Sequence, residues 1–125
     1  MDRVRKILVV DDDIDIVRIV SAMLEGRGWD VHTAVSGEEA LEEVRRNPPD
    51  LLLLDIMMPR MNGIEVLRKV REIAPSTSIV MITAFGDVET YLDSMDLGAC
   101  EYVNKPFEHE ELISTITRCL APQHA

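Results

Sequence analysis

Short apolar runs alternate with amphipathic segments five times along this chain, and this alternation constrains the fold more than any other feature. The expected strands are residues 6–10, 30–34, 50–54, 78–83 and 99–103. Runs such as LLLL and IVMI are apolar on both faces, as in strands that lie between two layers of helices. Because such strands usually form parallel sheets joined by helical crossovers, the pattern predicts a doubly wound α/β domain.

The segments between the strands have helical periodicity and recognisable ends. The expected helices are residues 14–26, a segment between Ser36 and Asn47, and residues 64–73, 87–97 and 107–120. Ser36 has the spacing of a capping box with a glutamate three residues later. Asp13 is expected to cap the first helix, with Asp15 as an acid in its first turn. Each strand is thus followed by one helix.

Composition bounds the class of protein. The 125 residues are about the size of one domain, and we expect a single domain over residues 1–125. The formal charge is −10 and the basic residues are scattered, so nucleic acid is not an expected direct partner. No signal peptide or run of eighteen apolar residues is found, which favours a cytoplasmic protein without membrane contact.

Two cysteines, Cys100 and Cys119, lie far apart in the sequence. They have neither CxxC spacing nor a neighbouring histidine cluster, and a chain of this size needs no disulfide. We therefore expect both to be free structural thiols.

Polar side chains follow four of the expected strands directly. For five strands, the order 2-1-3-4-5 is the economical one of the two common orders, with the switch point between strands 1 and 3. Asp11 and Asp12 follow strand 1, Asp55 follows strand 3, Thr83 ends strand 4 and Lys105 follows strand 5. Because ligands bind at the carboxyl ends of such strands, these side chains are expected to share one cleft.

Three carboxylates in one cleft repel one another unless a cation neutralises them, and Mg²⁺ is the natural choice beside a phosphoryl group. A calcium loop starting at the acidic run is excluded, because its sixth position is Ile16 and its twelfth is Ala22. Carboxylates can also act as nucleophiles, and Asp55 stands alone at its strand end. Lys105 and Thr83 could position and neutralise a transferred phosphoryl group.

Four stretches, ILVVDDD, LLLLDIMMPRMNG, MITA and NKPF, resemble the signatures of the receiver (CheY-like) domain of two-component response regulators. They occur in the order and spacing of that family, and the resemblance covers about residues 5–120, leaving 121–125 as a tail. It implies a flavodoxin-like (βα)5 sandwich around a parallel five-stranded sheet of order 2-1-3-4-5.

The resemblance also implies a phosphorylation site. Asp55 matches the phosphoacceptor, which receives a phosphoryl group from a sensor histidine kinase or a histidine phosphotransfer protein. Asp11 and Asp12 match the acidic pair that binds Mg²⁺ together with Asp55 and the backbone carbonyl of Met57. Such a domain is a signalling domain rather than an enzyme, and catalyses only its own phosphorylation and dephosphorylation.

Further matches concern the bound phosphoryl group and the response to it. Thr83, Ala84 and Lys105 match residues that stabilise the phosphoryl group, and Thr83 with Tyr102 matches the switch pair. The bond before Pro106 matches a position that is usually cis. Without the resemblance, Thr83 and Tyr102 would also suit ordinary packing roles in their strands.

The implied output is a change in the face formed by the fourth helix, the fifth strand and the fifth helix. That face would contact an output domain or an effector, and could support a homodimer. The expected partners are therefore the histidine kinase or phosphotransfer protein and an output domain or effector.

Two alternatives compete with this interpretation. A haloacid dehalogenase type of phosphatase would use Asp11 as nucleophile and Asp13 as acid–base, but it needs a longer chain and a second acidic motif after its lysine. This chain offers there only Glu108, Glu110 and Glu111, on an expected helix. A receiver-like module that binds partners without phosphorylation is the other alternative, and the complete set of signatures disfavours it.

Overall fold

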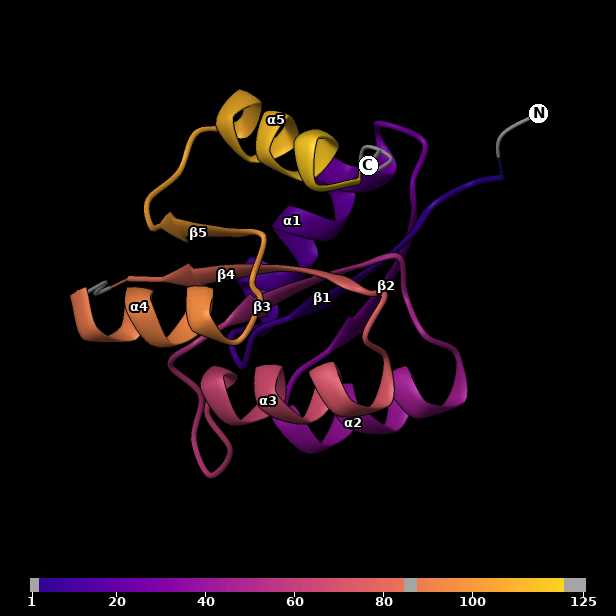
Figure 1. The fold of residues 1–125 in the computed structure, drawn as a ribbon. Helices are drawn as coiled ribbons and strands as arrows, with labels where there is room; N and C mark the ends of the chain where they lie inside the picture. Colours follow the sequence, from indigo (N-terminus) through magenta and orange to yellow (C-terminus); the bar gives the residue numbers. More distant parts are fainter. Residues whose placement is uncertain (1–2, 85–87, 121–125) are drawn as a thin grey trace.

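A computed structural model describes residues 3–84 and 88–120, without the side chain of Val88. Strands and helices alternate strictly along these residues (Figure 1). The elements are β1 Lys6–Val10, α1 Ile14–Glu25, β2 Asp30–Ala34, α2 Gly37–Arg46, β3 Leu51–Asp55, α3 Gly63–Ile73, β4 Ser78–Thr83, α4 Val88–Asp96, β5 Glu101–Asn104 and α5 His109–Leu120.

The five strands form one parallel sheet in the order β2-β1-β3-β4-β5. The predicted flavodoxin-like fold and its strand order are therefore confirmed. Two strand starts differ from prediction. β3 begins after Asp50, whose carboxylate accepts a hydrogen bond from the backbone N–H of Lys6. β5 begins at Glu101, two residues after Ala99, whose backbone N–H donates to the carbonyl oxygen of Ser94 and closes the turn after α4.

Two apolar layers hold the helices on the sheet. Figure 1 shows α1 and α5 on one face of the sheet and α2 and α3 on the other. Alternate residues of β1 serve the two layers, since Leu8 and Val10 pack towards α2 and α3 while Ile7 and Val9 pack towards α1 and α5. Burying each such side chain contributes about 1.5–3 kcal/mol, so the strand pattern fixes both helix layers. The runs LLLL and IVMI of β3 and β4 are buried throughout, which confirms the prediction that they are apolar on both faces.

Capping residues fix where the helices start. Asp13 caps α1 through hydrogen bonds from the N–H groups of Asp15 and Ile16, and Ser36 caps α2. Asn62 forms a capping box with Glu65 and starts α3. Both caps predicted from the sequence are confirmed.

The two cysteines form a disulfide, so the prediction of free thiols is wrong. The cysteines are 19 residues apart in the sequence, but they are close in the fold. Cys100 is the residue before β5 and Cys119 is in the last turn of α5, and these two segments lie side by side. The Cα atoms are 6.1 Å apart, within the range that a disulfide can bridge.

Some predictions lie at the limits of the described chain. Residue 87 of the expected fourth helix and the expected tail 121–125 lie outside the described residues. Among the residues that are described, no helix is long and apolar enough to cross a bilayer.

Candidate functional site

Three carboxylates meet at the carboxyl end of the sheet. Asp11 and Asp12 follow β1, and Asp55 is the last residue of β3, the neighbouring strand. One carboxylate oxygen from each lies within 4.8 Å of the others. Asp11 and Asp55 are buried, at 5% and 4% exposure, whereas Asp12 is exposed. The cluster predicted from strand ends is thus present, with one acid open to solvent.

Lys105 brings a positive charge to this cluster. Its ammonium nitrogen lies 2.9 Å from Oδ2 of Asp11 and 3.8 Å from Oδ1 of Asp55. The backbone N–H of Lys105 bonds to the carbonyl of Thr83 at the end of β4, which anchors the loop after β5. The Lys105–Pro106 peptide bond is cis, as predicted from the resemblance.

The surroundings of Asp55 disfavour the ionised form of its carboxyl group. Burial and then the negative charge of Asp11 raise the pKa of Asp55 to about 7, although Lys105 and the N–H of Met57 favour the ionised form. Burial alone lowers the pKa of Lys105, but its hydrogen bond to Asp11 and the nearby carboxylates outweigh this effect, and the pKa is raised. One ammonium group is insufficient to neutralise the cluster.

The donor set suits a hard cation. Carboxylate oxygens are the preferred ligands of Mg²⁺, which typically takes one or two carboxylates and keeps several waters. An exposed acid beside two buried ones leaves a side from which an ion and its waters could enter. The three carboxylates could therefore hold a divalent metal ion, with a phosphoryl group beside that ion.

The acidic run divides into two functions. Asp11 faces the cluster, and its Oδ1 also accepts a hydrogen bond from the N–H of Asp13 at 3.0 Å. Asp13 in turn caps α1, and Asp15 is in the first helical turn. Among the described residues, the group of acids that could hold a metal consists of Asp11, Asp12 and Asp55.

Gly63 supports the site in a way that the sequence did not reveal. The expected third helix began at residue 64, but Asn62 is the cap of α3 and Gly63 its first residue. A Cβ atom on Gly63 would lie 2.5 Å from the backbone oxygen of Asp55. Only a glycine therefore allows α3 to start this close to the end of β3. The glycine in MNG was visible, but its contact partner could not be read from the local sequence.

The remaining predicted site residues lie on neighbouring elements. Thr83 is buried at the end of β4, and Ala84 after it is exposed. Met57 is 59% exposed, while its N–H donates to Oδ1 of Asp55 at 3.3 Å. The ring of Tyr102 on β5 makes an edge-to-face contact with Tyr91 of α4, with centroids 5.5 Å apart.

A family comparison agrees with this geometry. The model of the response regulator receiver domain family matches residues 7–117. The chain belongs to this family. It is a receiver domain of the two-component response regulators, a class of signalling domains in which phosphorylation and signalling to output domains are typical.

Solved structures share the fold of this receiver domain. A CheY-like receiver domain protein from Methanospirillum hungatei JF-1 superposes with a TM-score of 0.92 at 31% identity, covering 94% of each chain. The chemotaxis protein CheY4 of Vibrio cholerae gives a TM-score of 0.89 at 34% identity, over 94% of this chain and 99% of that one.

Curated relatives are longer than this chain. The transcriptional regulatory protein ZraR of Escherichia coli K12 is 40% identical over 119 residues, which are 95% of this chain and 27% of ZraR. The transcriptional regulatory protein DltR of Streptococcus agalactiae is 39% identical over 111 residues, 89% of this chain and 50% of DltR. The receiver domain thus spans about a quarter to a half of these relatives.

Proposed function

We propose that Asp55 is the phosphoacceptor of this receiver domain. The observation that carries the proposal is a buried strand-end carboxylate with two further acids and an ammonium group within reach. In the transfer, an Oδ atom of Asp55 forms a bond to phosphorus while the bond to the donor nitrogen breaks. The departing imidazole takes a proton, and the product is an aspartyl phosphate.

Mg²⁺ is the proposed cofactor, and it supplies charge neutralisation when bound. Asp12, Asp11, Asp55 and the backbone carbonyl of Met57 would hold it. Asp12 is the exposed member of the set, which makes it the most accessible ligand. Asp11 already forms an ion pair with Lys105. It would therefore position that lysine and also contribute an oxygen ligand to the metal.

Lys105 and Thr83 are the proposed contacts of the phosphoryl oxygens. The ammonium group is 3.8 Å from Oδ1 of Asp55 before any phosphoryl group is present, so a short movement would bring it to the new charge. Thr83 ends the strand next to β3, and Ala84 leaves the approach beside it open because its side chain is small. The same residues would assist hydrolysis of the aspartyl phosphate. The proposed catalysis is thus limited to the domain's own phosphorylation and dephosphorylation.

The proposed switch couples Thr83 to Tyr102. Phosphorylation adds nearly two negative charges at Asp55, and Thr83 would move towards them, leaving space for the Tyr102 ring. That ring already contacts Tyr91 of α4, so its rotation would repack α4 against β5. Shifting a 1:99 population to 99:1 requires about 5.5 kcal/mol of preference for the active state.

The proposed output surface is the face of α4, β5 and α5. Tyr91, Leu92 and Met95 of α4 are exposed apolar side chains, at 45%, 52% and 36% exposure. Such side chains support contact with an output domain, an effector or a second copy of the domain. A homodimer through this face remains a prediction.

The proposed donor is a protein, either a histidine kinase or a histidine phosphotransfer protein. An apolar pocket of about 430 Å³ adjoins the site, and the side chains that line it come from α1, from Ala84 and from the loop that carries Lys105 and Phe107. Ile19 of α1 is 62% exposed beside it. This surface would seat an apolar helix next to Asp55, which a small phosphodonor does not require.

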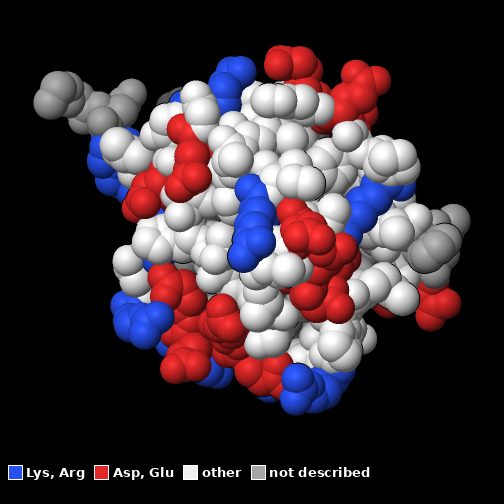
Figure 2. Space-filling model, turned by 180° about the vertical axis from the view of Figure 1, so that it is seen from behind, with Lys and Arg blue, Asp and Glu red and all other residues white. Residues whose placement is uncertain are grey.

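Nucleic acid is not a proposed direct partner. Figure 2 shows one face of the molecule, on which lysine and arginine side chains are dispersed among acidic ones. This agrees with the formal charge of −10. A cytoplasmic location and a single-domain organisation of residues 1–125 remain predictions.

Incubation with Mg²⁺ and acetyl phosphate, followed by intact mass, tests the proposal. Wild type is expected to gain one phosphoryl group and Asp55→Asn none. Asp13→Asn is the matched control, because it removes one negative charge, as Asp55→Asn does, and asparagine can still cap α1. This control variant should gain the phosphoryl group as wild type does.

Three results would contradict the proposal. Phosphorylation of Asp55→Asn at the wild-type rate would exclude Asp55. Loss of phosphorylation in Asp13→Asn, with continuous release of phosphate from a generic ester by wild type, would favour the phosphatase. No phosphate on wild type would favour a module that only binds partners.

A further inference from the structure

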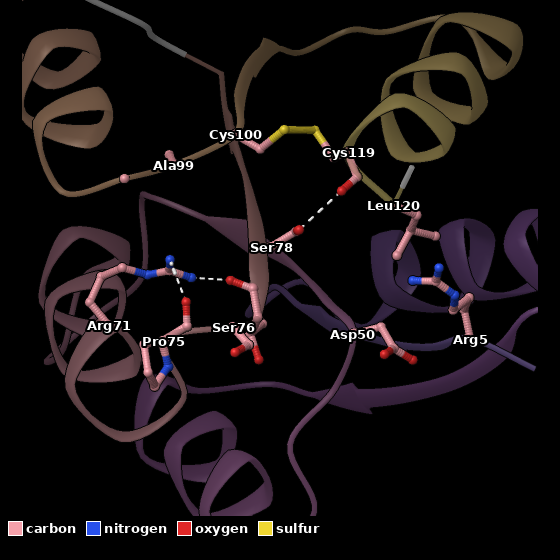
Figure 3. Close-up of a pocket in the computed structure, with 12 residues that line it drawn as sticks. Arg5, Asp50, Arg71, Pro75, Ser76, Ser78, Ala99, Cys100, Cys119 and Leu120 are labelled. Carbon is pink, nitrogen blue, oxygen red and sulfur yellow. Dashed lines mark hydrogen bonds between the residues drawn. A yellow bond between two sulfur atoms is a disulfide. The ribbon is translucent and has the colours of Figure 1, made fainter. Parts of the chain in front are cut away.

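A second pocket lies at the amino ends of the strands, the opposite end of the sheet from Asp55. The disulfide forms part of its wall (Figure 3). Its volume is about 690 Å³. The residues that line it precede or begin strands, as Arg5 precedes β1, Asp50 precedes β3 and Ser78 begins β4. The pocket is therefore separate from the proposed phosphorylation site.

The lining of this pocket carries an excess of positive charge, on a chain of net charge −10. Figure 3 shows Arg71 and Arg5 on opposite sides, with Asp50 between them. The carboxylate of Asp50 is already bonded to the guanidinium of Arg3 and to a backbone N–H. An anionic ligand in this pocket would therefore meet two guanidinium groups and one carboxylate that is already hydrogen-bonded.

Arg71 has no carboxylate partner within the described part of the chain. Its terminal nitrogens donate to the backbone carbonyls of Pro75 and Thr77, and its Nε atom is buried without a hydrogen-bond acceptor. Burial lowers the pKa of this guanidinium. Arg71 thus adds to the pocket lining a guanidinium group that no carboxylate of the described residues neutralises.

Both cysteines of the disulfide line the pocket, but they differ in exposure. Cys100 is partly exposed, whereas Cys119 is 4% exposed. The carbonyl of Cys119 accepts a hydrogen bond from the hydroxyl of Ser78, which fixes the last turn of α5 (Figure 3). An attacking thiolate must reach a disulfide sulfur directly, so we expect attack at Cys100, the more exposed residue of the pair.

We propose that this pocket binds an anionic low-molecular-weight thiol, of the glutathione class, which exchanges with the Cys100–Cys119 disulfide. The thiolate sulfur forms a bond to the sulfur of Cys100, the bond between the two cysteines breaks, and Cys119 leaves as a thiolate that takes up a proton. A second thiolate then attacks the mixed disulfide, releasing the oxidised small disulfide and the Cys100 thiolate, which is protonated. Two small thiols are oxidised and the protein disulfide is reduced.

The exchange acts on a covalent tie between β5 and α5. The disulfide ties the residue before β5 to the last turn of α5, and the segment between the two cysteines contains Tyr102 and Lys105. Reduction removes this covalent tie between two elements of the proposed output surface. The exchange itself does not require phosphorylation of Asp55.

The test compares glutathione with the neutral thiol 2-mercaptoethanol on the oxidised, folded protein. Samples are quenched with acid at intervals, and intact mass with peptide mapping gives the rate and position of the adduct. We expect a single adduct on Cys100. The ratio of the glutathione rate to the 2-mercaptoethanol rate should fall about threefold in Arg5→Gln, because one charge at the pocket wall is lost.

Arg45→Gln is the matched control, since it removes the same charge from an exposed position on α2 that does not line the pocket. Its rate ratio should equal that of wild type. An unchanged ratio in Arg5→Gln would overturn the proposal, as would an adduct on Cys119 or exchange only after unfolding in urea. The readout does not use Asp55, so the proposed function could fail without affecting it.

Discussion

Replacing Asp55 by asparagine should stabilise this receiver domain in metal-free buffer at neutral and higher pH. The pKa of Asp55 is raised to about 7 from its usual 3.8, chiefly by burial and then by Asp11. The folded domain therefore holds a proton that the unfolded chain has lost, between about pH 4 and pH 7. The free energy of unfolding falls as pH rises through that window and stays lower above it.

The magnitude follows from the size of the shift. About three pKa units at 1.4 kcal/mol each give an upper limit near 4 kcal/mol for the cost of ionised Asp55. The asparagine side chain in Asp55→Asn would be neutral and could still accept the N–H of Met57, which Asp55 accepts at 3.3 Å. For a domain of this size we expect a gain of about 2–4 kcal/mol at pH 8, or roughly 8–15 °C in Tm.

Urea unfolding at pH 4 and pH 8, with a chelator present, measures the difference between Asp55→Asn and wild type. The difference should be large at pH 8 and below about 1 kcal/mol at pH 4, where both side chains are neutral in the folded domain. Added Mg²⁺ should stabilise wild type more than the variant. An equal difference at both pH values, or a less stable variant at pH 8, would refute the electrostatic argument.

Other substitutions test separate contacts. Gly63→Ala should cost more than about 2 kcal/mol in urea unfolding, because its Cβ would meet the Asp55 backbone oxygen at 2.5 Å; Gly26→Ala, with 3.4 Å to its nearest atom, is the control. Asp13→Ala should cost about 1 kcal/mol through loss of the α1 cap. Cys100→Ser should lower the stability of the oxidised protein by about 3 kcal/mol, because a loop of about twenty residues is no longer closed. Equal stability of variant and wild type under oxidising conditions would contradict the presence of the disulfide.

Sequence reasoning predicted most of the fold because the signals were local and periodic. The both-face apolar pattern of β3 and β4 required two helix layers, and the strand ends then placed Asp11, Asp12 and Asp55 together. Asp13 was separable from its neighbours because a helix cap has its own sequence context.

The errors involve contacts between residues that are distant in the sequence. Nothing local indicates that Cys100 faces Cys119, since this depends on how α5 packs back along the sheet. The helix expected over residues 64–73 did not include Gly63, yet the backbone of Asp55 requires a glycine at the start of α3. The pKa of Asp55 likewise depends on burial that only the folded domain provides.

The most direct test of Asp55 as the phosphoacceptor is to locate the phosphoryl group chemically. An aspartyl phosphate is an acyl phosphate, so borohydride reduction converts that residue alone to homoserine, which peptide sequencing by mass spectrometry can place. After treatment with acetyl phosphate and Mg²⁺, we predict homoserine at position 55. Homoserine in place of Asp11, Asp12 or Asp13, or at no position, would contradict the assignment.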